Sequence, residues 1–153
     1  MGPERSDQQA VRAERSVVGA AASQAAAARD GELNASIARA AVRLHRSHVG
    51  RGPTKARAFF RDNIVVVVLE DVLTRSERSL VASGRHDTVI RVQEALLETM
   101  QADLIAAIET LTDRRVTAFM SATHLEPDMA VEIFVLDRPV ESGPPTPAAS
   151  NRS

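Results

Sequence analysis

The sequence predicts an α+β domain in which a four-stranded antiparallel sheet, formed by two hairpins, packs against two main helices. One observation is the run Ile64–Leu69, six consecutive apolar residues of which five are β-branched, a composition that favours strands over helices. A second apolar run, Met129–Leu136, lies near the other end of the chain. Apolar residues at helical spacing precede the first run and separate it from the second. The predicted order of elements is therefore α-ββ-α-α-ββ.

Length and composition indicate a single domain without disulfide or thiolate chemistry. The chain has 153 residues, a hydrophobic fraction of 44% and a net charge of -1, so its global charge attracts neither nucleic acid nor anionic membranes. It contains no cysteine, tryptophan or tyrosine. No apolar run approaches the roughly 18 residues that span a bilayer, and no signal-peptide pattern is recognisable. We expect a cytoplasmic protein that does not insert directly into a membrane.

The two ends of the chain differ in composition from its middle. Residues 1–31 are rich in Ala, Arg, Gln and Ser, which predicts a flexible tail, with a solvated helix between Gln8 and Arg29 as the alternative. Residues 138–153 are rich in Pro, Ser and Gly and are expected to be disordered. Residues 32–137 are predicted to form the single folded domain.

The first predicted helix of this domain starts near Glu32. Its apolar residues recur at helical spacing and define one face. The positions on this face are Leu33, Ile37, Ala40, Ala41, Leu44 and His48. Gly50 can adopt the left-handed conformation that ends a helix, and Pro53 prevents the helix from continuing.

The first hairpin follows this helix. A strand from about Thr54 to Asp62 shows polar and apolar alternation, so its two faces differ. The two rows are Ala56, Ala58 and Phe60 on one face, and Lys55, Arg57, Phe59 and Arg61 on the other. Asp62 and Asn63 tolerate positive φ and predict a two-residue turn into the apolar strand Ile64–Glu70.

Two helices and a second hairpin complete the domain. Thr74, with Glu77 three residues later, has the pattern of a capping box and opens a short helix that ends near Ser83 and Gly84. The remaining predicted elements are a long helix over residues 87–111 and strands over residues 116–122 and 129–136, joined by a loop at 124–128.

A sheet whose central strands are apolar on both sides needs cover on both faces. The helices can cover only one of them. Phe59, which lies on the opposite side of its strand from Phe60, adds apolar surface to the second face, and such a patch is unusual on a monomer. We therefore expect a homodimer that packs through sheet or helix. The alternative is that the N-terminal tail folds over its own sheet.

One candidate binding surface lies around the first strand. It consists of Arg51, Lys55, Arg57, Phe59 and Arg61. Cations with an interleaved aromatic ring can hold a phosphate backbone and stack one base. A solvated strand edge kept positive to prevent aggregation is the simpler interpretation, because a single phenylalanine makes a poor stacking platform. Nucleic acid is therefore the less favoured partner.

The sequence predicts no catalytic, cofactor-binding or metal-binding residues. His45 and His48 can share a helix face, but two imidazoles without a nearby carboxylate are too few for a metal site. No glycine-rich segment has the pattern of a nucleotide-binding loop. Glu132, inside an apolar strand, is expected to pair across the sheet with Arg57 or Arg61. We expect a protein that is not an enzyme.

An ordered series of short motifs runs through the predicted domain. In chain order these are Gly50-Arg51-Gly52-Pro53, Ala56-Arg57-Ala58-Phe59, Val72-Leu73-Thr74 with Glu77 and Leu80, Arg91, Ser121, Asp128, and Val131-Glu132-Ile133-Phe134-Val135-Leu136. With this series, residues from about 33 to 137 resemble the MpsC-like family. That family comprises small bacterial domains named after the MpsC component of a sodium-translocating, membrane-potential-generating system.

The resemblance implies a small cytosolic protein with no catalytic residues to carry over. It also implies an association with membrane partners that move sodium or support the uptake of dissolved inorganic carbon. The expected function is a non-enzymatic interaction or accessory domain, a peripheral component or regulator of such a system. An integral-membrane transport subunit is then a candidate partner. A nucleic-acid-binding regulatory domain that uses the basic face of the first strand is the alternative.

Overall fold

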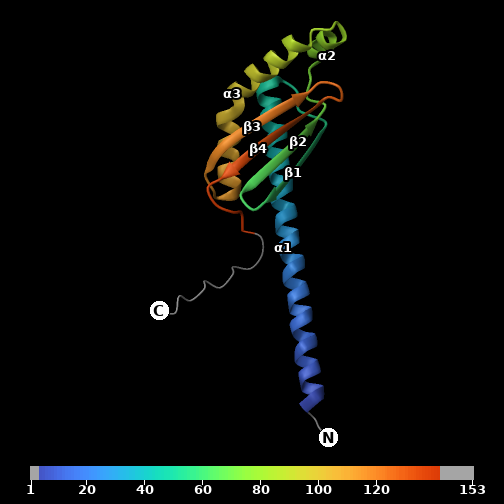
Figure 1. Ribbon diagram of the computed structural model, residues 1–153, viewed down its shortest axis with the longest axis vertical. Helices are drawn as coiled ribbons and strands as arrows, with labels where there is room; N and C mark the ends of the chain where they lie inside the picture. Colours follow the sequence, from blue (N-terminus) through green and yellow to red (C-terminus); the bar gives the residue numbers. More distant parts are fainter. Residues whose placement is uncertain (1–3, 142–153) are drawn as a thin grey trace. The chain divides into compact units, whose positions relative to one another are not determined.

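The computed structural model describes residues 4–141 of the chain. Residues 33–140 form one compact unit, and residues 4–32 belong to a separate one. The elements are α1 (Glu4–Val49), β1 (Lys55–Arg61), β2 (Ile64–Glu70), α2 (Arg75–Ala82), α3 (His86–Thr112), β3 (Val116–His124) and β4 (Met129–Leu136) (Figure 1). This order, α-ββ-α-α-ββ, confirms the predicted α+β fold with its two hairpins.

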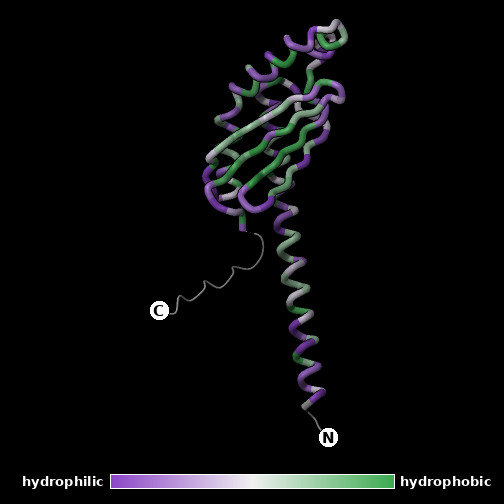
Figure 2. The backbone as a smooth tube through the Cα atoms, in the orientation of Figure 1, coloured by the Kyte–Doolittle hydropathy of each residue, from purple (hydrophilic) through white to green (hydrophobic). Residues whose placement is uncertain are grey.

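The strands form one antiparallel sheet of four strands in the order β1-β2-β4-β3. The two hairpins meet through β2 and β4, which pair along their length, from Ile64 opposite Val135 to Glu70 opposite Met129. These central strands are the two apolar runs of the sequence, and both stand out as hydrophobic in Figure 2. Burial nevertheless alternates along β2, so within this chain only one of its two apolar faces is fully covered.

Helices cover one face of this sheet, which we call the inner face. Figure 1 shows α3 and the C-terminal part of α1 behind the sheet. On β2 the side chains of Val65, Val67 and Leu69 are fully buried. The other large members of this core are Ile37, Leu73, Met100, Leu104, Ile108, Phe134 and Leu136. The predicted apolar row of β1, Ala56, Ala58 and Phe60, also packs against this core.

The helix α1 is longer than the predicted helix. It begins at Glu4 instead of near Glu32, because residues 4–31 are rich in alanine, which has high helix propensity, and contain no proline. From Glu4 onward the segment expected to be a flexible tail is thus helical, as in the alternative that placed a helix between Gln8 and Arg29. Val18 in this segment is 68% exposed. No helix within the described residues is both long and apolar enough to cross a membrane.

Several local signals in the sequence have the predicted structural effect. Gly50 follows α1 with a φ of +87°, and Asp62 forms the hairpin turn with a φ of +54°. Thr74 caps α2, where its side-chain oxygen accepts from the backbone N–H of Glu77 and the Glu77 carboxylate accepts from the backbone N–H of Thr74. These features confirm the predicted helix end, turn and capping box.

The packed domain extends slightly beyond its predicted end. Residues 138–153 were expected to be disordered, yet Val140 is 8% exposed and belongs to the hydrophobic core. Its backbone N–H donates a 2.9 Å hydrogen bond to the carbonyl oxygen of Asp62. The rest of the predicted C-terminal tail, residues 142–153, lies outside the described residues.

Candidate functional site

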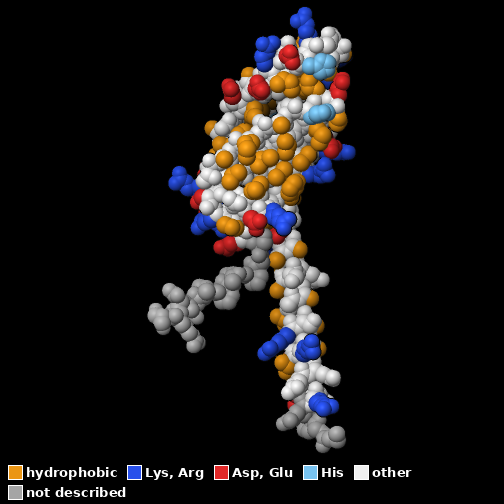
Figure 3. Space-filling model, viewed as in Figure 1, with side chains coloured by type: hydrophobic (Ala, Val, Ile, Leu, Met, Phe, Trp, Pro, Cys, Tyr) orange, Lys and Arg blue, Asp and Glu red, His pale blue; other side chains and the backbone are white. Residues whose placement is uncertain are grey.

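The sheet face opposite the helices, here called the outer face, is mainly apolar. Alternate residues of each strand lie on it. Its apolar members are Phe59 of β1, Ile64, Val66 and Val68 of β2, Met129, Val131, Ile133 and Val135 of β4, and Ala118, Met120 and Ala122 of β3. Phe59 and Met120 are each 52% exposed, and Figure 3 shows hydrophobic side chains gathered across this face. A continuous apolar patch of this kind is typical of an interaction surface.

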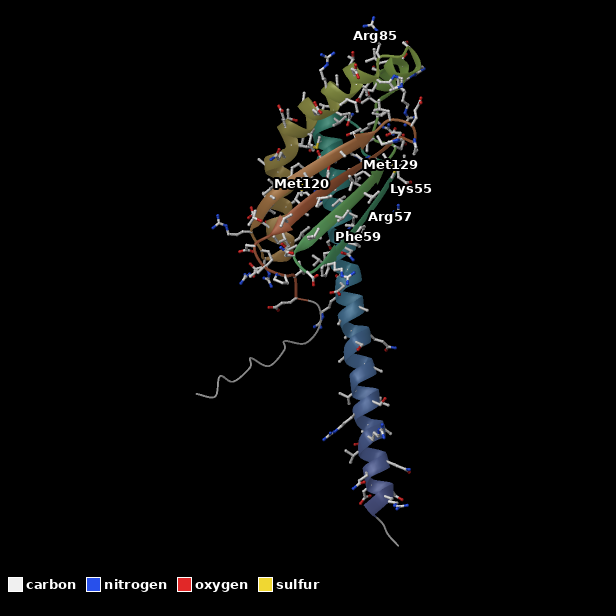
Figure 4. The ribbon with its side chains drawn as sticks, viewed as in Figure 1. Lys55, Arg57, Phe59, Arg85, Met120 and Met129 are labelled. Atoms are coloured by element: carbon white, nitrogen blue, oxygen red, sulfur yellow. The ribbon has the colours of Figure 1, made fainter. Side chains whose placement is uncertain are left out.

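A row of charged side chains borders the outer face along β1. Figure 4 labels Lys55, Arg57 and Phe59 along this strand, and Arg61 continues the same alternating exposed row. Lys55 and Arg57 lie 3.7 and 3.6 Å from the carboxylate of Glu70 on β2. The acidic side chain therefore offsets part of the positive charge of this row.

Arg51, the fifth residue of the predicted basic surface, lies apart from this row. Its Nη2 atom is 2.9 Å from Oδ2 of Asp71, and its Nη1 atom donates to the carbonyl oxygen of Leu73. Arg78 of α2 contacts the same Asp71 and lies 3.5 Å from Asp128. The structure thus groups four of the five predicted residues on β1. The fifth, Arg51, belongs to an ion-pair network with the segment that follows β2.

An open cleft of about 710 Å³ adjoins this network. It is lined by the start of β1, the end of β2, α2 and the turn before β4. The charged groups in its wall face one another, since Asp71 pairs with Arg78 and Lys55 approaches Glu70. This mutual pairing neutralises part of the charge within the cleft.

A buried histidine–carboxylate pair lies beneath the inner face. Glu132 of β4 is 2% exposed, and its Oε1 atom is 2.7 Å from Nε2 of His45 on α1, which is 12% exposed. The predicted pairing of Glu132 with Arg57 or Arg61 is therefore wrong. Those arginines lie on the outer side of β1, whereas Glu132 alternates in step with the fully buried Phe134 and points inward. The sequence carries a signal for this orientation: Glu132 lies two residues before Phe134, so the two side chains fall on the same face of the strand.

His48, three residues after His45, contacts a different carboxylate. Its Nε2 atom is 2.9 Å from Oδ2 of Asp103 on α3. The two histidines therefore serve separate contacts between α1 and its neighbours. Over the part of the chain that the structure describes, no group of three or more His, Cys, Asp or Glu residues is arranged to hold a metal ion.

Comparison with known proteins identifies the family. A family model described as Na+-translocating membrane potential-generating system (MpsC) matches residues 29–138. This range contains the outer face, the ion-pair network and the His45–Glu132 pair. No curated protein and no solved structure matches the chain. Because the family model covers well over half of the sequence, the chain belongs to the MpsC family.

Proposed function

We propose that this chain is a non-enzymatic interaction domain, an accessory or regulatory component of the sodium-translocating system after which its family is named. The observation that carries the proposal is the apolar outer face, because a surface of this composition gains free energy when a partner covers it. The ion pairs around the cleft support the same interpretation, since charged groups held by one another stabilise a scaffold.

The proposed occupant of the outer face is a second copy of the chain. The charge distribution is compatible with it, because β1 presents three cations along one edge of the outer face, whereas β3 presents only His124, at its end, along the other edge. A twofold axis that runs parallel to the strands would stack β1 of one copy over β3 of the other. The cations Lys55, Arg57 and Arg61 would then face the uncharged row Ala118, Met120 and Ala122. An axis perpendicular to the strands would instead place cations over cations, which is unfavourable.

The size of the face sets the expected strength of this dimer. Four strands about 4.8 Å apart and about seven residues long cover roughly 450 Å² in projection. A stable interface buries about 800 Å² on each partner. A dimer formed through the outer face alone should therefore be reversible and should depend on concentration. A reversible dimer leaves the outer face free for part of the time. An integral-membrane transport subunit is therefore the second candidate partner for this face.

Sedimentation velocity over a range on the order of 10 to 1,000 µM tests the dimer. We expect a monomer–dimer equilibrium in the unmodified chain. Met120→Lys should abolish the dimer, because the new cation would face the β1 cations of the other copy, whereas Met120→Glu should weaken it less. Both changes are at a side chain that is 52% exposed, so the fold should tolerate them.

Val92→Lys provides the matched control, since Val92 is a 37% exposed apolar residue of the helix α3. The control should dimerise like the unmodified chain. A chain that stays monomeric over the whole range would overturn the proposal that a second copy covers the face. Equal losses in Met120→Lys and Val92→Lys would also overturn it.

A nucleic-acid-binding regulatory domain is the second candidate function. Phe59 lies between Arg57 and Arg61 in an exposed row, an arrangement that can contact a phosphate backbone and stack one base. The test is salt-dependent retention on a single-stranded nucleic acid column. Retention that Arg57→Glu abolishes and Arg91→Glu on α3 preserves would support this function. Failure to bind at low salt would exclude it.

A further inference from the structure

Three arginines follow one another along an exposed stripe of α1. Arg39, Arg43 and Arg46 are spaced by four and three residues, so they lie on one side of the helix, and all three are exposed. We call them the α1 arginine row. Arg39 donates a 3.1 Å hydrogen bond to the hydroxyl of Ser36, and within residues 4–141 neither Arg43 nor Arg46 has a hydrogen-bond or ion-pair partner. No carboxylate of the described chain therefore pairs with this row.

The α1 arginine row places like charges at the spacing at which helix side chains are neighbours. Like charges three or four positions apart destabilise a helix, and Arg39 and Arg43 are such a pair. The cations of β1 differ, because Lys55 and Arg57 both lie near the carboxylate of Glu70. An anion from outside the chain would offset the repulsion within the row. The row therefore points to an anionic partner.

An open groove of about 390 Å³ runs beside the row, between α1 and β1. Apart from the three arginines, its lining consists of the apolar residues Ala38, Val42 and Ala56. A second groove, of about 420 Å³, lies between α1 and α3 and shares Arg39 and Arg43 with the first. Neither groove is lined by an aromatic ring on which a base could stack. Cations beside an apolar groove fit an anionic amphiphile better than a nucleic acid.

We propose that the α1 arginine row binds the anionic phospholipid headgroups of a membrane surface, with the apolar groove beside β1 next to the acyl chain of one bound lipid. The guanidinium group suits this role, because its planar fork binds two phosphate oxygens at once. Such binding is electrostatic and requires no insertion into the bilayer. The inference adds a membrane contact to the proposed accessory role. The row lies on the helix side of the sheet, so a partner on the outer face leaves it accessible.

Co-flotation of the full chain with lipid vesicles tests this contact. At low ionic strength, vesicles of equal parts phosphatidylcholine and phosphatidylglycerol should bind the chain, whereas vesicles of phosphatidylcholine alone should not. Each basic side chain near an anionic bilayer raises the partition coefficient about fivefold, so the row as a whole contributes roughly 100-fold. The binding should be largely lost at about 0.5 M salt, because exposed charges are screened.

Two triple variants locate the contact. The first combines Arg39→Glu, Arg43→Glu and Arg46→Glu and should lower the partition coefficient at least about 100-fold. The matched control combines Arg75→Glu, Arg85→Glu and Arg91→Glu, which changes the net charge equally at exposed arginines outside both grooves and should preserve binding. Circular dichroism checks that both variants are folded. The single change Arg43→Ala, with an expected loss of about fivefold, keeps the proposal testable if the first variant does not fold.

Three results would overturn the proposal. The first is the absence of binding to the anionic vesicles at low ionic strength. The second is an equal loss of binding in the two triple variants. The third is preferential binding of a single-stranded oligonucleotide that the changes in the α1 arginine row abolish, which would assign the row to nucleic acid. The outer-face dimer is measured by sedimentation without lipid, so the failure of either proposal is distinguishable from the failure of the other.

Discussion

The carboxylate of Asp128 accepts a 3.0 Å hydrogen bond from the backbone N–H of Val72. The same carboxylate accepts a second bond, of 3.1 Å, from the backbone N–H of Leu73. The carbonyl oxygen of Asp128 accepts a further bond from the backbone N–H of Asp71. These bonds join the segment after β2 to the turn before β4, at one end of the central strand pair. Asp128 thus links the two hairpins by satisfying donors that the sheet leaves unpaired.

Replacement of Asp128 should therefore destabilise the domain. Val72 and Leu73 are 7% and 1% exposed, so Asp128→Ala leaves two buried donors without an acceptor. We expect the free energy of unfolding to fall by about 2–4 kcal/mol, with a smaller loss for Asp128→Asn, which keeps one acceptor oxygen. Urea unfolding followed by circular dichroism measures both. Glu126→Ala in the same turn is the control, and a loss no larger in Asp128→Ala than in this control would contradict the assigned role.

The capping box of α2 gives a second prediction. Thr74→Ala removes the oxygen that accepts from the backbone N–H of Glu77, and the domain should lose about 1 kcal/mol of stability. Ser76→Ala, at an exposed position of the same helix, should change stability by less than about 0.5 kcal/mol. Thermal denaturation of the two variants compares them directly. Indistinguishable Tm values would show that the cap contributes nothing measurable.

Local patterns allowed most of the elements to be predicted from the sequence. The boundaries predicted for β4, Met129–Leu136, are those observed, because a β-branched and apolar run between polar turns has few alternative structures. The capping box at Thr74 and the turn at Asp62 were recognisable for a similar reason, since each depends on residues close together in the sequence. Side-chain alternation also assigned the two faces of β1 correctly.

Contacts between distant residues could not be predicted in the same way. His45 and Glu132 are 87 positions apart, and only the packing of α1 against the inner face brings them together. Arg51 was grouped with the basic row of β1, because nothing local shows that Asp71 and Leu73 take up its guanidinium group. The inward orientation of Glu132 could be predicted from the alternation of side chains along its strand, but the identity of its histidine partner could not.

The position of α1 residues relative to the core gives a third prediction. Ile37 and Val18 are both β-branched residues of the same helix, but Ile37 is fully buried and Val18 is 68% exposed. Ile37→Ala should lower the free energy of unfolding by about 2–5 kcal/mol, because it leaves a cavity against the sheet. Val18→Ala should change it by less than about 0.5 kcal/mol. Comparable losses in chemical denaturation would contradict the burial difference.

The buried pair gives the last prediction, through a double-mutant cycle. His45→Leu leaves Glu132 without its partner at 2.7 Å and should lower the free energy of unfolding by about 3–5 kcal/mol, because the carboxylate stays buried and uncompensated. In the double variant His45→Leu with Glu132→Met, both polar groups are replaced by apolar ones, so most of that loss should be recovered.

Chemical denaturation of the unmodified chain and of the three variants measures the cycle. The single change His48→Leu is the control, since its carboxylate partner Asp103 is 59% exposed and can be hydrated when the histidine is lost. Its cost should be below about 1 kcal/mol. If the losses from His45→Leu and Glu132→Met are simply additive, the two side chains are not coupled. The stabilisation must then come from the packing of each residue separately.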